Sequence, residues 1–199
     1  NTQIENPNLM LEGMPNYRSG VDGLRVSNST KGGITFAAST TQNGIHMITV
    51  VLGVEAVDGD PYARFVATSS LMNYVVRTFV SSIVVKEGDP YGKSKATVMD
   101  GKSETVLAVA KKDFYIVEKQ GSQAEPKIQF KSNQESFRAP VKSGTNLGKL
   151  HYTDPDKIGR GYLEDQEPTV DMVAGRTIEK SFFLKVWWNE FVRYVNEKL

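Results

Sequence analysis

The hydrophobic pattern of the first part of the chain contains two short runs that favour β-strands. Residues 34–39 and 45–52 are rich in apolar and β-favouring side chains, and Thr41-Gln42-Asn43-Gly44 separates them. An Asn-Gly pair accepts the positive φ angles that a tight hairpin turn requires. The pattern therefore predicts two antiparallel strands.

A helix is predicted next, over about residues 61–80. Asp60 stands at a capping position and Pro61 at the first helical position, as is typical of a helix start. The apolar residues after them recur at helical spacing: Phe65, Leu71, Met72, Val75, Val76 and Phe79. We expect this helix to pack its apolar face on the hairpin.

From about residue 88 to residue 175 the helical period disappears. Short apolar runs recur between turn residues, at 105–110, 114–117, 127–130 and 147–152. The strongest hairpin turn signal among them is Asp100-Gly101. The segment thus predicts a small all-β module, and its thirteen basic and thirteen acidic residues predict a neutral surface without a strong field.

The last segment, residues 176–199, predicts an amphipathic helix. One stripe on it holds apolar residues at i, i+3, i+4, i+7 and i+11, namely Leu184, Trp187, Trp188, Phe191 and Val195. The stripe fits a helix docked on its own domain or on a partner. It also fits a helix lying in a membrane interface, where apolar insertion would dominate because five basic and three acidic residues give the segment a charge of only +2.

Composition narrows the classes of function. The 199 residues are 39% hydrophobic, enough to bury a core, and 24 Lys+Arg against 23 Asp+Glu give no general attraction for nucleic acid. The chain has no cysteine, which excludes disulfides, thiolate zinc sites and cysteine nucleophiles. His46 and His151 are far apart, so we expect neither a metal site nor a Ser-His-Asp triad.

The opening at Asn1 without an initiator methionine suggests a piece of a longer polypeptide.

Residues 17–33 hold the most informative motif, Gly20-Val21-Asp22-Gly23-Leu24-Arg25-Val26-Ser27. It resembles the third motif region of low-molecular-mass penicillin-binding proteins, the D-alanyl-D-alanine carboxypeptidases, whose usual form is Gly-Val-Asp-Gly-Leu-Lys-Thr-Gly. The resemblance continues in the family's order through residues 48–53, 64–65, 71–74, 113–115, 139–144 and 181–183. It therefore covers nearly the whole chain.

This resemblance implies an α+β chain in three parts. Residues 1–88 would be the end of a serine β-lactamase/transpeptidase-like domain (antiparallel sheet plus helix), 89–175 a small all-β pedestal domain and 176–199 the C-terminal amphipathic helix as a membrane anchor. The parent enzyme would remove the terminal D-alanine from peptidoglycan pentapeptides through an acyl-enzyme and bind β-lactams. It would lie on the extracytoplasmic face of the bacterial cell membrane. The implied partners are the peptidoglycan stem peptide or a β-lactam and the membrane surface, with no nucleic acid, cofactor or metal.

The family's Ser-x-x-Lys and Ser-x-Asn motifs are absent from the 199 residues. We therefore expect the nucleophile upstream of Asn1, no catalytic residue in this chain, and no activity of the chain alone. The third motif also departs from Lys-Thr-Gly. Arg25 keeps the charge that attracts the substrate carboxylate, Val26 loses the hydroxyl, and Ser27 adds a Cβ where glycine lets the ligand approach closely. Arg25 also fits a plain solvated strand residue.

Two further residues are candidates for substrate binding through the same resemblance. Ser29 falls where the family often places a second hydroxyl, although turns favour serine in any case. Arg64 matches an arginine that reaches the substrate carboxylate, although it also fits a surface arginine near a helix N-terminus, where positive charge gains nothing from the dipole. The alternative for the whole chain is a catalytically degenerate or truncated homologue that acts as a membrane-bound spacer or binding module.

Overall fold

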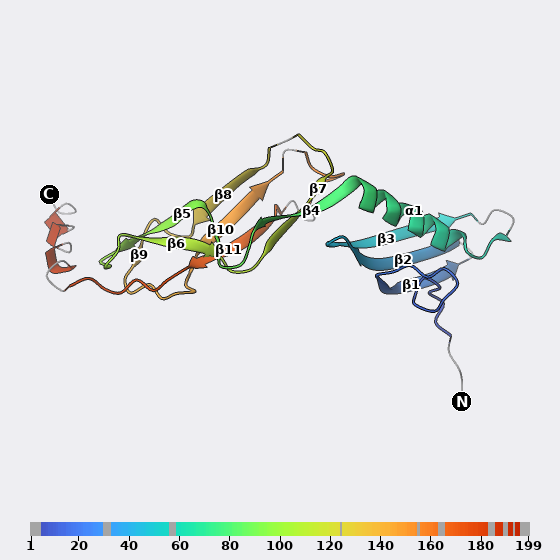
Figure 1. Cartoon of the computed structure of the whole chain (residues 1–199), viewed down its shortest axis with the longest axis horizontal. Helices are drawn as coiled ribbons and strands as arrows, with labels where there is room; N and C mark the ends of the chain where they lie inside the picture. The colour runs from blue at the N-terminus through green and yellow to red at the C-terminus, as the bar shows by residue number, and fades with distance from the viewer. Residues whose placement is uncertain are drawn as a thin grey trace, which may run out of the picture. The chain divides into compact units, whose positions relative to one another are not determined.

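A computed structural model describes residues 5–29, 33–55, 59–123, 125–154, 156–162, 166–182, 186–188, 191–192 and 194–195. The described chain is mostly β-structure with the α-helix α1 (Figure 1). It forms two compact units, Asn1–Ser81 with Val117–Gly121, and Ser82–Ile116 with Ser122–Leu199. Each unit has its own hydrophobic core.

The first unit is a three-stranded antiparallel sheet with a helix on one face (Figure 1). Its strands are β1 (Val21–Ser29), β2 (Gly33–Gln42) and β3 (Ile45–Val54), in that order, and α1 (Ala63–Thr78) contacts β2 and β3. The predicted hairpin is confirmed, with Asn43 and Gly44 at φ 52° and 74°.

The core of the first unit lies between this sheet and α1. Phe36 on β2 meets Phe65 on α1 edge to face, with ring centroids 5.1 Å apart, and Met72 is fully buried beside them. Burying each of these side chains contributes about 1.5–3 kcal/mol. The helix therefore covers one face of the sheet, while alternate residues of β3 are exposed on the other face.

The helix is confirmed, but its start and its apolar face differ from the prediction. The Asp60 carboxylate accepts the N–H of Tyr62 (2.8 Å), as a capping residue does, but residues 61 and 62 form a turn and the helix begins at Ala63 rather than Pro61. Leu71 is 43% exposed and lies outside the packed face. The chain turns to extended backbone at Phe79, where a run rich in β-branched residues favours a strand over a helix.

The second unit confirms the predicted all-β module. Its main sheet has the order β8-β10-β11-β6-β5-β9. Strands β4 and β7 form a separate pair, and each of them has residues in both units. The strands are β4 (Phe79–Val85), β5 (Pro90–Met99), β6 (Thr105–Ala110), β7 (Phe114–Lys119), β8 (Lys127–Ser132), β9 (Phe137–Arg138), β10 (Asn146–Thr153) and β11 (Thr169–Ala174). The four predicted runs all lie in strands, whereas β4, β5, β9 and β11 were not predicted.

The Asp100-Gly101 signal does mark the connection between β5 and β6, but the connection is not a two-residue turn. Asp100 takes a φ of 58° and begins a loop of five residues before β6. Its side chain is 2% exposed and its Oδ2 lies 3.3 Å from Nε of Arg138, which makes it part of the packing of the unit.

Near the C-terminus, residues 186–188, 191–192 and 194–195 have helical backbone, and Leu184 lies outside the described residues. One continuous amphipathic helix over residues 176–199 therefore stays a prediction. Among the described residues no helix combines the length and the apolar character needed to span a bilayer.

Candidate functional site

The motif predicted to carry the chemistry lies on β1, which is an edge strand. In the three-stranded sheet β1 pairs with β2, with Arg25 opposite Ala37 and Ser27 opposite Thr35. No other strand of the described chain pairs with its second edge. The free backbone groups of such an edge are able to pair with an extended ligand.

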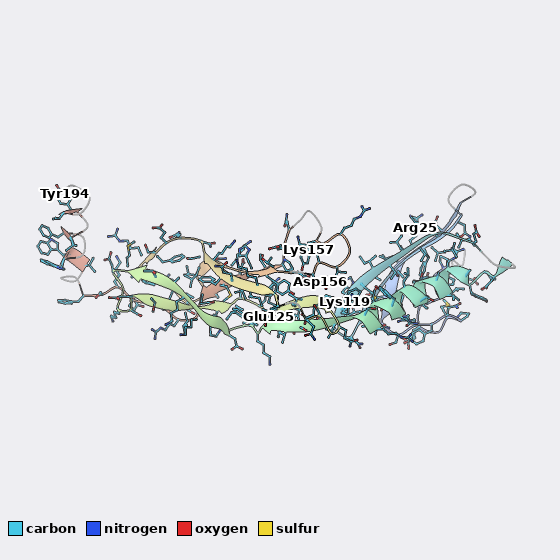
Figure 2. The ribbon with its side chains drawn as sticks, turned by 90° about the horizontal axis from the view of Figure 1, so that it is seen from above. Arg25, Lys119, Glu125, Asp156, Lys157 and Tyr194 are labelled. Carbon is cyan, nitrogen blue, oxygen red and sulfur yellow. The ribbon has the colours of Figure 1, made fainter. Side chains whose placement is uncertain are left out.

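Successive side chains of β1 point to opposite faces of the sheet, so the three central motif residues differ in exposure. Arg25 and Ser27 are exposed, whereas Val26 is partly buried and packs against the core of the first unit. The side chain of Arg25, labelled in Figure 2, has no hydrogen bond or ion pair with a described residue. An exposed guanidinium without a partner is free to take a carboxylate in a bidentate fork.

The structure brings Arg64 to the same strand. The first-turn position in α1 places its side chain under the end of β1, where it is only 6% exposed. Its Nη1 donates to the carbonyl oxygens of Ser27 and Thr35, each at 3.3 Å, and its Nη2 donates to Oδ1 of Asn28 at 2.5 Å. Burial lowers the pKa of Arg64.

These contacts aim the Arg64 guanidinium at the backbone of the motif strand. It links the start of α1 to β1 and β2, so that the position of the motif depends on the helix. A direct contact of Arg64 with a substrate carboxylate stays a prediction. Sequence reasoning missed Asn28 as its partner, because no pattern in the sequence shows which side chain a buried arginine will reach.

A second arginine, which is partly buried, fixes the segment before β1. Arg18 donates from Nη1 to Oδ1 of Asn73 on α1 (2.8 Å) and from Nη2 to Oε1 of Gln42 on β2 (2.9 Å). The Gln42 amide in turn donates to the carbonyl oxygen of Ser19 (2.7 Å), and burial lowers the pKa of Arg18. This hydrogen-bond network, which the sequence did not predict, fixes the position of Arg18 and Ser19 just before β1.

The start of β1 is held from the neighbouring strand. Ser39 Oγ donates to Oδ1 of Asp22 at 2.5 Å, at the bulge between Val21 and Gly23. At the other end, Ser29 lies opposite Gly33, and its side chain lies outside the described residues. Within the described part of the chain no cluster of His, Asp or Glu side chains could hold a metal ion.

Four of the five predicted membrane residues are described. Trp187 and Trp188 are 63% and 59% exposed, Phe191 is 49% exposed, and Val195 is partly buried. The two tryptophan rings lie 6.1 and 6.0 Å from the Phe191 ring, centroid to centroid. The structure thus brings the three aromatic side chains into one cluster that remains about half or more in solvent.

Residues 79–180 match the family described as penicillin-binding protein 5, C-terminal domain. The match covers half of the chain, and it includes all strands of the second unit.

Two curated relatives carry the same name. The D-alanyl-D-alanine carboxypeptidase DacA of Haemophilus influenzae is 27% identical over 66% of this chain, which spans 32% of that protein. The Escherichia coli protein of that name is 24% identical over 83% of this chain and 38% of its own length. This chain therefore spans about a third of the curated relatives that it matches.

Two solved structures are similar as well. The peptidoglycan synthesis regulatory factor (PBP3) of Streptococcus pneumoniae is 45% identical with a TM-score of 0.83, over 88% of this chain and 48% of that one. Penicillin-binding protein 5 of Haemophilus influenzae shows a likeness of fold, with 23% identity and a TM-score of 0.56 over 81% of this chain and 43% of its own.

Proposed function

The chain belongs to the low-molecular-mass penicillin-binding proteins, in which it corresponds to their C-terminal region, and from this premise we propose that it is part of a serine-type D-alanyl-D-alanine carboxypeptidase. The substrate would be the terminal D-alanine of a peptidoglycan pentapeptide, on the extracytoplasmic side of the membrane. The name of the curated relatives supports this reaction.

The observation that carries the proposal is the exposed, unpartnered Arg25 on the edge strand β1. The free edge of β1 would pair with the extended end of the stem peptide, and Arg25 would hold its terminal carboxylate. A serine upstream of Asn1 would attack the carbonyl carbon between the two D-alanines. The C–N bond breaks, D-alanine leaves with a proton on its amine, and water then hydrolyses the acyl-serine ester.

Arg64 acts on this site through the strand. It holds the carbonyl oxygens of Ser27 and Thr35 and so fixes the part of β1 next to Arg25. A carboxylate held by one well-placed guanidinium tolerates little displacement, since a shift of about 1 Å can reduce a rate about 100-fold. We therefore assign Arg64 a positioning role in addition to the predicted contact with the carboxylate.

A second candidate is a non-catalytic spacer or binding module. Val26 supports it, because this side chain packs on the core and presents no hydroxyl, and so does Ser27, whose Cβ stands where glycine permits close approach. The two candidate functions predict different results for D-alanine release by an extended polypeptide. We define the extended polypeptide as this chain preceded by the N-terminal portion that its relatives have.

The test is D-alanine release from a pentapeptide by the extended polypeptide. The carboxypeptidase proposal expects turnover, with a KM at least about tenfold higher for Arg25→Gln, since a charge-assisted hydrogen bond contributes about 1.5–3 kcal/mol. Arg77→Gln, which changes an exposed arginine at the far end of α1, is the matched control and should leave KM unchanged. An extended polypeptide that folds and releases no D-alanine would favour the spacer.

The C-terminal segment would place the protein on the membrane surface. Its exposed aromatic cluster, Trp187, Trp188 and Phe191, supports an interfacial position, because each such side chain gains about 1.5–3 kcal/mol on leaving water. Liposome co-sedimentation should survive moderate salt, show a blue shift of tryptophan fluorescence, and disappear in Trp187→Ala with Trp188→Ala. Leu52→Ala with Leu107→Ala, two exposed residues outside this segment, is the control. Lipid binding that persists without the tryptophans would end the anchor proposal.

A further inference from the structure

The charged side chains on the strands of the six-stranded sheet are mostly basic. Six of their side chains are basic and one is acidic: Lys93, Lys95, Lys127, Lys131, Arg138 and Lys149 against Asp171. Yet residues 89–175 contain thirteen residues of each sign. The described acidic residues lie mostly in the turns and loops between strands. The module is thus neutral as a whole, but its basic side chains lie largely on the strands of this sheet and its acidic side chains largely in the connections.

Four lysines gather on the outer face of one half of this sheet, away from the core. Lys131 on β8 lies opposite Lys149 on β10, and Lys149 lies opposite Asp171 on β11. The N–H of Lys111 donates to the carbonyl oxygen of Asp171 (2.9 Å), which places Lys111 at the end of this row. Neighbouring strands are about 4.8 Å apart, so the row is about 14 Å long, and Lys127 lies about 13 Å from Lys131 along β8.

We call Lys111, Lys127, Lys131 and Lys149 the basic face. All four are exposed, and none has a side-chain hydrogen bond or ion pair with another described residue. Two like charges directly opposite each other destabilise a sheet, and one Asp171 beside them offsets only part of that repulsion. A bound anion would remove the repulsion.

His151 lies on β10, opposite Gln129 on β8 and Thr169 on β11. Burial is the main cause that lowers the pKa of His151, Lys131 and Lys149 lower it further, and Glu167 acts in the opposite direction. At the other end of the row, a hollow of about 310 Å³ is lined by Lys111, Lys112, Thr169 and Asp171. A hollow of this size accommodates a small polar group beside the lysines.

The composition of the face limits its partner. The outward positions of β8, β10 and β11 hold no Phe, Tyr or Trp: they are Lys127, Gln129, Lys131, Lys149, His151, Thr153, Thr169, Asp171 and Val173. The face therefore lacks the Phe, Tyr or Trp platform on which unpaired bases stack, and Val173 is the one apolar side chain among these nine positions, which is too little to insert into lipid. Regularly spaced lysines on a flat strip suit an extended chain of regularly spaced negative charges.

We propose that the basic face binds a linear polyanion whose charges are phosphate groups on a backbone without aromatic rings or lipid chains. The phosphates contact the row from Lys131 to Lys111, with Lys127 extending the contact along β8. This proposal stands independently of the carboxypeptidase function, because it uses only residues of the second unit.

Calorimetric titration of the 199-residue chain with long-chain inorganic polyphosphate, at 50 and 200 mM salt, tests the proposal. Lys131→Gln with Lys149→Gln should weaken binding about tenfold at 50 mM salt. The slope of log Kd against log salt should fall by about 1.4, the value for two contacts to a flexible polyanion. Asp171→Asn should strengthen binding instead. The matched control is Lys102→Gln with Lys142→Gln, which makes the same charge change at exposed positions outside the strands and should change Kd less than twofold.

Three results would overturn the proposal. They are no binding of polyphosphate at 50 mM salt, an equal loss in the control variant, and tighter binding to oligo-thymidine or to phosphatidylglycerol vesicles than to polyphosphate. Circular dichroism verifies that each variant is folded. If the double variant unfolds, the opposite effect of Asp171→Asn decides the matter, because failure to strengthen binding contradicts the proposal by itself.

Discussion

Replacing Arg64 with alanine tests whether this side chain holds the motif strand in place. The substitution removes three hydrogen bonds, two to the carbonyl oxygens of Ser27 and Thr35 and one to Oδ1 of Asn28. A hydrogen bond to a charged group contributes about 1.5–3 kcal/mol, and bonds of 3.3 Å lie at the weak end. Removing the buried charge returns part of this energy, so we expect the first unit to lose about 2–4 kcal/mol.

The assay is urea denaturation of the first unit, followed by hydrogen exchange in that unit. Tryptophan fluorescence would not report on it, because both tryptophans lie in the second unit. With a slope of about 1–1.5 kcal/mol/M, the midpoint of the first unit should fall by roughly 2 M. Hydrogen exchange should show lost protection in residues 21–29. Arg77→Ala is the control, since Arg77 is exposed in the last turn of α1 and its loss should cost at most about 0.5 kcal/mol. Equal effects of the two substitutions, or unchanged protection of β1, would refute the reasoning.

Three further outcomes are expected. In the second unit, Gly148→Ala should cost more than about 3 kcal/mol in thermal or urea unfolding, because a Cβ there would collide with the carbonyl oxygen of Lys131 and lie 2.8 Å from the Cα of Ser132. Gly159→Ala, where a Cβ meets nothing, should cost about 1 kcal/mol, and similar losses at both sites would contradict the clash. The lowered pKa of His151 means that the folded unit binds fewer protons than the unfolded chain as pH falls through about 6.5. Its melting temperature should therefore drop between pH 7.5 and 5.5, and drop less in His151→Gln. In the extended polypeptide, Val26→Thr with Ser27→Gly should raise the rate of acylation by a β-lactam in stopped-flow measurements. An unchanged rate would mean that Arg25 and Ser29 already supply the binding.

The sequence predicted those elements whose signal is local. The β2–β3 hairpin follows from Asn43-Gly44, and β6 follows from an apolar run between clear turns. Strand β5 was missed because its outward positions are lysines and threonine and because its register to β6 shifts between Pro90 and Lys95. The start of α1 was placed two residues too early, since the sequence shows a capping Asp60 but not that residues 61 and 62 form a turn before the helix.

For the site, the motif located Arg25 on a strand, whereas the edge position of that strand depends on sheet order. The role of Arg64 depends on which carbonyl oxygens lie beside it, and these belong to residues far away in the sequence. The distribution of charge also depends on residues far apart in the sequence. Composition predicted a neutral β-module, but only the structure shows that Lys131 and Lys149 face each other while acidic residues lie in turns. Long-range pairing is the information that composition and periodicity lack.

We propose that this chain supplies one wall of a serine carboxypeptidase site whose nucleophile lies upstream. Intact-mass spectrometry after incubation with benzylpenicillin tests it most directly, on the 199-residue chain and on the extended polypeptide in parallel. The account predicts a stoichiometric mass increase by one penicilloyl group on the extended polypeptide and none on the 199-residue chain. An adduct on the 199-residue chain, or no adduct on a folded extended polypeptide, would contradict it.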